Sequence, residues 1–199
     1  MKSVLISIRP QWVEKIFHEI GWCMPSAKGK KIYEKSIEVR KNKPNEVPFK
    51  AYIYCTGGKL LFKSTDGNLY ISKYFKYNGQ EDAFNCKVIG EFVCDKVFLL
   101  HPYIFDGGSA DLEHRKFIQT FETSSKHNEI LSGTCLSQDE MFDYIGVGNY
   151  GYGWHISRLK IYDKPKDLRE FFTHMGKRPS YMIERPPQSW QYVEELENG

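Results

Sequence analysis

Hydrophobic and polar residues alternate in the first part of the chain, except for one stretch at helical spacing. Residues 4–8 alternate with period two, which predicts a strand with Ser7 and Arg9 on the face away from the core. Between residues 11 and 20 the apolar positions follow a helical stripe. We therefore predict a helix that begins at Pro10 and ends near Gly21.

Two more strands follow a polar, basic stretch. In residues 35–40, Ile37 and Val39 point one way, whereas Ser36, Glu38 and Arg40 share the opposite face. Residues 49–56 alternate in the same manner and place Tyr52, Tyr54 and Thr56 opposite the aliphatic side chains of their own strand.

The rest of the chain reads mainly as β-structure with short helices. The predicted elements are a hairpin over 60–77 turning at Asp66-Gly67, a long strand over 87–100 bent near Gly90, a helix over 137–144 with a Ser137/Glu140 capping box, a strand over 154–162 with a bulge near Ser157-Arg158, a short helix from Pro165 to Phe172, and a strand over 190–193. Residues 106–133 have weak periodicity and are predicted to be a partly helical insertion.

These elements predict an α+β fold. Short strands without alternating βαβ units favour a small mixed or antiparallel β-barrel, with helices flanking its openings. A length of 199 residues suits one domain, 1–199, with the insertion at about 106–133.

Composition narrows the function classes only slightly. Hydrophobic residues at 41% and charged residues at 27% are ordinary for a globular protein, whereas 15% aromatic residues favour strands and flat stacking surfaces. The net charge of +3 names no partner. Basic residues do gather between Lys28 and Lys43, with Lys28, Lys30 and Lys31 at the start; this stretch is either a phosphate-facing patch or a solvated loop.

Cysteine spacing and hydropathy exclude several other classes. Five scattered cysteines form no C-x-x-C pair, so we expect no disulfide framework, no structural metal and no cofactor. No segment is long and apolar enough for a signal peptide or a membrane span, so we expect a cytoplasmic protein without a membrane partner. Residues 146–151 match G-x-G-x-x-G, but a helix precedes them and a strand follows, the reverse of a dinucleotide site.

Charged residues on the strand over 35–40 are the main candidates for chemistry. Lys35 offers a cation for phosphate or carbonyl oxygen, and Glu38 offers a carboxylate for general base catalysis. Arg40 shares their strand, and Ser7 and Arg9 come from the first strand. The alternative is an exposed salt-bridge ladder.

Several segments together resemble the ASCH domains of the PUA-like superfamily. The matching segments are Ser7-Ile8-Arg9-Pro10-x-Trp12-Val13-x-x-Ile16, Lys35-Ser36-Ile37-Glu38-Val39-Arg40-Lys41, Lys87-Val88-Ile89-Gly90-Glu91-Phe92 and Trp154-His155-Ile156. The resemblance implies a β-barrel with a cleft between barrel and helices, and a role in RNA binding. Some members are amidohydrolases that deacetylate N4-acetylcytidine, and ribonuclease activity is also associated with the family. The amidohydrolases carry a lysine, matched by Lys35, and a threonine three residues later, where this chain has Glu38.

Four further residues are candidates for ligand contact. Tyr54 is a candidate for stacking on a base, Thr56 and Trp154 for the lining of the cleft, and His155 for a base, a phosphate contact or a structural role. The leading hypothesis is a module that binds RNA or a nucleotide, preferring single-stranded or looped RNA. The alternatives are a hydrolase acting on a modified nucleoside or RNA phosphodiesters through Lys35 and Glu38, and a protein-interaction domain with an unknown protein partner.

Overall fold

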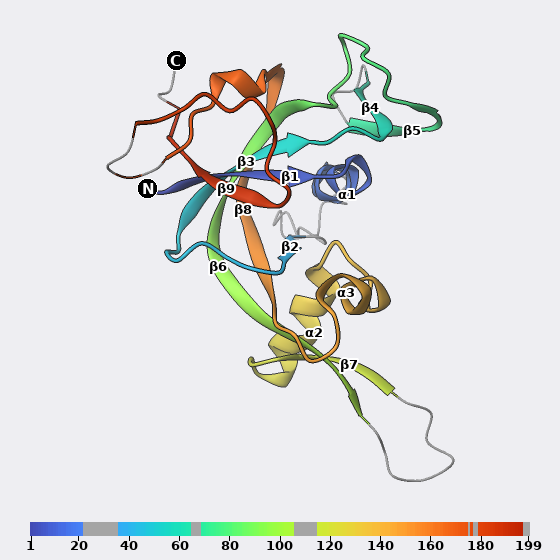
Figure 1. The fold of residues 1–199 in the computed structure, drawn as a ribbon. Helices are drawn as coiled ribbons and strands as arrows, with labels where there is room; N and C mark the ends of the chain where they lie inside the picture. Colours follow the sequence, from blue (N-terminus) through green and yellow to red (C-terminus); the bar gives the residue numbers. More distant parts are fainter. Residues whose placement is uncertain (22–35, 65–68, 106–114, 175, 177–178, 197–199) are drawn as a thin grey trace, which may run out of the picture.

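A computed structural model describes residues 1–21, 36–64, 69–105, 115–174, 176 and 179–196 (Figure 1). The large sheet contains β1 (Ser3–Ile8), β2 (Ile37–Arg40), β3 (Phe49–Cys55), β6 (Lys87–Phe105), β7 (Arg115–Thr120), β8 (Gly151–Lys166) and β9 (Trp190–Val193). A small second sheet pairs β4 (Lys59–Lys63) with β5 (Leu69–Lys76). The helices are α1 (Pro10–Gly21), α2 (Ser124–Gly133), α3 (Gln138–Ile145) and the single 3₁₀ turn η1 (Leu168–Glu170).

The large sheet is mixed and strongly bent. Its strands pair in the order β2-β8-β6-β3-β1-β9, and β7 pairs with the second half of β6. β1 and β3 run parallel, and the other pairs are antiparallel. With its flanking helices, the molecule has the predicted α+β class.

Side chains connect the two ends of this bent sheet. Arg40 of β2 donates to the carbonyl oxygen of Ser7 on β1 at 2.9 Å. The indole nitrogen of Trp190, at the start of β9, donates to Asn42 just beyond β2 at 2.6 Å. The barrel-like curvature is therefore fixed by side-chain hydrogen bonds where β2 approaches β1 and β9.

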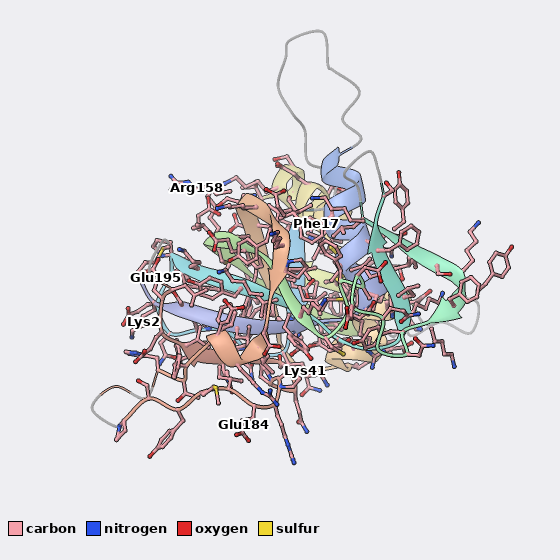
Figure 2. All side chains as sticks on the ribbon, turned by 90° about the horizontal axis from the view of Figure 1, so that it is seen from above. Lys2, Phe17, Lys41, Arg158, Glu184 and Glu195 are labelled. Carbon is pink, nitrogen blue, oxygen red and sulfur yellow. The ribbon has the colours of Figure 1, made fainter. Side chains whose placement is uncertain are left out.

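The long strands bend where the sequence pattern predicts it. The β6–β8 register shifts at Gly90, and a Cβ there would collide with the carbonyl oxygen of Lys160. The predicted bulge in the later strand is confirmed, because the register also shifts between Ser157 and Lys160 and Arg158 has a φ of 51°. Figure 2 labels Arg158 at this bend.

Among the described residues, three hydrophobic cores hold the layers together. The first lies between the sheet and α1, where Val13, Ile16 and Phe17 are buried (Figure 2). The second lies on another face of β1 and β3, covered by the C-terminal segment through Phe171 and Ile183. The third lies under α2 and α3. Glu195 of the C-terminal segment forms an ion pair with Lys50 of β3 at 2.8 Å.

One predicted element is wrong. Residues 165–172 do not form a helix, because β8 continues through Pro165 to Lys166, which pairs with Val88. Asp167 then caps only the single turn η1. Phe171 is fully buried in the second core, and its burial draws the chain out of helical geometry immediately after that turn.

The remaining predicted elements are present with shifted ends, except that the predicted hairpin turn at Asp66-Gly67 lies outside the described residues. The helix over 137–144 is α3, with both hydrogen bonds of the predicted capping box. Residues 146–151 form the glycine-containing turn between α3 and β8. The described part of the 106–133 segment contains β7 and α2.

Neither a membrane span nor a metal cluster is found in the described part of the chain. No helix there is long and apolar enough to cross a bilayer. No group of three or more His, Cys, Asp or Glu residues in the same part is arranged to hold a metal ion.

Candidate functional site

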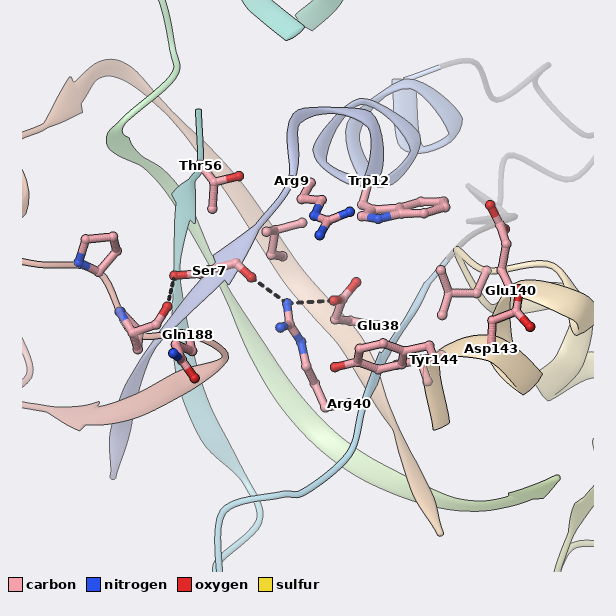
Figure 3. A pocket seen from close by; sticks show the side chains of 15 residues that line it. Ser7, Arg9, Trp12, Glu38, Arg40, Thr56, Glu140, Asp143, Tyr144 and Gln188 are labelled. Carbon is pink, nitrogen blue, oxygen red and sulfur yellow. Dashed lines mark hydrogen bonds and ion pairs between the residues drawn. The ribbon is translucent and has the colours of Figure 1, made fainter. Parts of the chain in front are cut away.

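A pocket of about 690 Å³ opens where the first strand, β2, two helices and the C-terminal loop meet (Figure 3). Its walls come from the β1–α1 junction, from β2, from α3 and from residues 186–188. This volume lies in the range of sites that hold small organic ligands.

A buried ion pair forms the base of the pocket. Glu38 and Arg40 are two residues apart on β2 and therefore share a face. Their side chains are both 8% exposed, and Arg40 Nη2 lies 2.8 Å from Glu38 Oε1. Burial raises the pKa of the Glu38 carboxyl, while the adjacent guanidinium of Arg40 opposes that rise. Arg40 Nε is buried without a hydrogen-bond partner among the described residues.

A free cation stands at the mouth of the pocket. Arg9 is exposed and, within the described residues, has no acidic partner. Its carbonyl accepts hydrogen bonds from Trp12 at 2.9 Å and Val13 at 3.0 Å, so the first turn of α1 fixes its backbone. Pro10 suits the first helical position because its missing N–H has no partner to lose there. Figure 3 shows the guanidinium turned into the pocket.

Two helices contribute aromatic and acidic walls. Trp12 comes from α1, and Tyr144, Glu140 and Asp143 come from α3. Asp143 and Tyr144 follow Glu140 by three and four positions, and residues at these spacings lie on the same side of a helix. Glu140 is held by its capping interaction with Ser137, whereas Asp143 is exposed.

The last wall is the loop before β9. The Ser7 hydroxyl donates to the carbonyl of Pro187 at 2.6 Å, and the Ser7 backbone N–H donates to that of Ser189 at 2.9 Å. These bonds hold Gln188 at the pocket edge. Ser7 therefore positions this wall rather than offering its hydroxyl to a ligand.

The structure brings some of the predicted residues together and separates others. Five line the same pocket: Ser7, Arg9, Glu38, Arg40 and Thr56. Ser36 lies outside it, and its carbonyl accepts from Ile156 N. Lys28, Lys30, Lys31 and Lys35 lie outside the described residues.

Three of the predicted residues are elsewhere. Tyr54 is 6% exposed and belongs to the second core, because the C-terminal segment covers its face of β3. Trp154 is fully buried in the first core, where its ring meets Phe49 and Trp190 edge-on. Neither ring borders the pocket, because each is packed in a hydrophobic core. His155 lies outside the pocket and pairs with Asp95 at 2.6 Å.

Sequence reasoning missed the residues from α3. The helix itself was predicted, but its position beside β2 depends on the third core, where Met141, Phe142 and Ile145 pack against Ile37 and Val39. The available signal was the exposed side of that helix, where Glu140, Asp143 and Tyr144 fall together. Trp12 was assigned only to the packing stripe of α1, although it is half-buried and borders the pocket.

Comparison with known proteins identifies the fold. No protein-family model matches the sequence, and no curated protein matches it. The crystal structure of ASCH from Zymomonas mobilis aligns with a TM-score of 0.50 at 13% identity, covering 98% of this chain and 89% of that one. A tyrosine-to-phenylalanine variant of the same protein gives 0.50 at 12% identity, with coverage of 98% and 92%. The fold of this chain is therefore ASCH-like, as the sequence motifs around Lys35–Arg40 and Trp154–Ile156 predict.

Proposed function

We propose that the pocket binds one nucleotide unit of single-stranded or looped RNA. The observation that carries this proposal is the exposed Arg9, which has no acidic partner among the described residues and lies beside two aromatic side chains, Trp12 and Tyr144. A guanidinium binds phosphate oxygens with directional hydrogen bonds, and indole and phenol rings stack on unpaired bases. The ASCH-like fold, with its resemblance to RNA-binding domains, supports the same ligand class.

The charges of the pocket favour a nucleotide with a single phosphate. Arg9 is on one side, whereas Glu140 and Asp143 are on α3. A carboxylate repels phosphate but accepts hydrogen bonds from amino and hydroxyl groups. We place the phosphate near Arg9 and Thr56, and the base or ribose donors near α3. A polyphosphate would bring excess negative charge towards Asp143.

Arg40 has a structural part in this proposal. Its guanidinium already binds Glu38 and the Ser7 carbonyl, so it is not free to clamp a phosphate in the way that Arg9 is. It holds β2 against β1 and so keeps the pocket open at its base.

Ligand binding by the wild type and four variants tests the proposal. Thermal shift and calorimetric titration would use cytidine and adenosine monophosphates and a single-stranded RNA of about 4 nucleotides, within the range that one small barrel covers. We expect Trp12→Ala to weaken RNA binding by about tenfold. Arg9→Ala should reduce the magnitude of the slope of log affinity against log salt concentration by about 0.7.

Two controls lie away from the pocket. Arg169 is exposed on η1, and Tyr181 is 60% exposed in the C-terminal segment. Arg169→Ala and Tyr181→Ala should bind as the wild type does. Absence of binding to all three ligands at low salt would refute the proposed function.

A second candidate function is hydrolysis of a modified nucleoside or of RNA. The observation in its favour is Glu38, a buried carboxyl at the pocket whose pKa is raised by burial, as is common for catalytic acids and bases. Product formation from N4-acetylcytidine and from short RNA would decide it. A hydrolase should lose turnover by about 10²-fold or more in Glu38→Gln while still binding substrate. A binding module should release no product with either protein. Because Glu38 stands where the deacetylases carry threonine, we expect little or no deacetylation.

A further inference from the structure

The β4–β5 hairpin carries an unusual bulge on its second strand. Lys59 pairs with Lys76 and Leu61 pairs with Ile71. Between these pairs β4 has one residue, Leu60, whereas β5 has the four residues 72–75. The additional residues cannot join the ladder and are pushed out of it.

Ser72 fixes the shape of this bulge. Its hydroxyl oxygen accepts hydrogen bonds from the backbone N–H groups of Tyr74 at 3.2 Å and of Phe75 at 2.9 Å. Serine hydroxyls commonly stabilise turns in this manner. As a result, two consecutive aromatic residues are held outward, with Tyr74 89% exposed and Phe75 65% exposed.

The inner face of the hairpin is already occupied. Leu61 and Leu69 are buried in the first core, and Ile71 packs against it. The backbone N–H of Ile71 donates to Glu14 on α1 at 2.9 Å, which anchors β5 to that helix. The hairpin projects at the edge of the molecule in Figures 1 and 2. Burying Tyr74 and Phe75 against this chain would require breaking the hydrogen bond between Ile71 and Glu14.

Lysines surround the exposed rings. Lys59, Lys73 and Lys76 are exposed and form no ion pair within the described residues. Lys63 differs, because it reaches Asp163 at 3.5 Å. The sequence from residue 73 to 76 is thus cation, ring, ring, cation, which matches a polymer that alternates phosphates with flat bases.

We propose that the β4–β5 hairpin is a second contact surface for single-stranded RNA, outside the pocket. The proposal rests on the proposed function only for the identity of the ligand. Tyr74 and Phe75 stack on bases, while Lys73, Lys76 and Lys59 bind the phosphates. The two sites are linked along the chain, because Lys59 follows the pocket residue Thr56 by three positions and Tyr77 N donates to the Gly58 carbonyl at 2.9 Å.

RNA length separates the hairpin from the pocket. Fluorescence anisotropy would compare a mononucleotide with single-stranded RNA of about 4 and about 12 nucleotides. We expect Tyr74→Ala/Phe75→Ala to weaken binding of the longest RNA at least fivefold and to leave the mononucleotide unaffected. Lys73→Ala/Lys76→Ala should reduce the salt slope for the longest RNA by about 0.7 per lysine.

Matched changes elsewhere control for loss of exposed rings. Phe121 and Tyr181 are 62% and 60% exposed and lie outside the hairpin, so Phe121→Ala/Tyr181→Ala should bind the longest RNA as the wild type does. Circular dichroism and thermal unfolding would show that the hairpin variants are folded, as expected for largely exposed side chains.

The possible outcomes show whether the pocket proposal or the hairpin proposal fails. If the hairpin variants bind the longest RNA as tightly as the wild type, the hairpin proposal is wrong, whatever the pocket does. If the mononucleotide does not bind but the hairpin variants still lose affinity for long RNA, the pocket function fails and the hairpin proposal stands. Binding of wild-type protein to neutral phosphatidylcholine vesicles through Tyr74 and Phe75, with no effect of these residues on RNA, would also overturn it.

Discussion

The adjacent strands β1 and β3 have a closed end and an open end, and the two differ in what covers them. At the closed end, Tyr52 is buried under the C-terminal segment, with Phe171 packed on it at 5.1 Å between ring centroids. Tyr54 pairs with Ser7 where the two ends meet and is buried under the same segment. At the open end, Ser7 and Thr56 border the pocket. Both ends carry polar atoms at alternate strand positions, so alternation alone does not distinguish a core from a binding site.

Two tyrosine hydroxyls at the closed end have hydrogen-bond partners within the protein. The Tyr52 hydroxyl accepts from Leu196 N at 3.0 Å, and the Tyr162 hydroxyl donates to Glu91 at 2.6 Å. Burial, together with the neighbouring Glu91, raises the pKa of Tyr162 far above its ordinary value. At the open end Arg9 has no such partner among the residues described, which leaves it available to a ligand. The pocket therefore differs from the core in having a charged side chain that is free to bind a ligand.

Removing the cover of the closed end should have the largest effect. Phe171 is fully buried, so Phe171→Ala should lower the free energy of unfolding by about 3–5 kcal/mol. Urea unfolding measures this change. Its neighbour Phe172 is 41% exposed and serves as the matched control, with an expected loss well below that of Phe171. Equal losses in the two variants would show that the C-terminal segment does not seal this end.

Breaking the ion pair at the base of the pocket should have the next largest effect. Glu38→Ala leaves the buried Arg40 without its carboxylate partner. This change should lower the free energy of unfolding by about 3 kcal/mol at neutral pH. A double-mutant cycle with Arg40→Met checks the cause, because the double variant should lose less than the sum of the single losses. Additive losses would mean that the two side chains are not coupled.

The pH dependence of stability gives a smaller and more specific signal. Because burial raises the pKa of Glu38 above its ordinary 4.5, the associated stability is fully present below pH 4.5 and is lost as the pH rises through the folded-state value. Glu38→Gln should remove this dependence, whose slope is at most about 1.4 kcal/mol per pH unit. Urea unfolding between about pH 4 and 8 measures it. Glu129→Gln, at an exposed position, should retain the wild-type profile.

The smallest effect is expected at His155, which the sequence placed among the ligand contacts. Its ring nitrogen lies 2.6 Å from Asp95, and the two side chains are 32% and 42% exposed. Partial burial opposes ionisation of Asp95, but the hydrogen bond and charge of His155 together lower its pKa. His155→Ala should therefore lower the free energy of unfolding by no more than about 1 kcal/mol and leave nucleotide affinity unchanged. A tenfold loss of affinity in His155→Ala would place it in the site after all.

The sequence predicted local structure better than it predicted exposure. The strand alternation in β2 correctly separated Ile37 and Val39 from Glu38 and Arg40, because side-chain direction is a local property. Whether Tyr54 faces a ligand or a core depends on residues more than one hundred positions later, near Phe171 and Ile183. No local pattern contains that information.

The same limit explains the residues that were missed. Tyr144 and Asp143 reach the pocket only because the third core holds α3 beside β2. The helix from Pro165 was predicted from the proline at its start, which does not report that Phe171 is buried in a core. In each case tertiary packing, which the local sequence does not show, determined the position or conformation of the segment.

Backbone amide chemical shifts during titration with a mononucleotide test the central claim most directly. A mononucleotide fits the pocket alone, so its effects report on the open end of β1 and β3 without the hairpin. We expect the largest shifts at Arg9, Thr56, Tyr144 and Gln188, and small ones at Tyr52, Tyr162 and Phe171. Shifts concentrated on the closed end, with the pocket residues unchanged at saturation, would contradict the account.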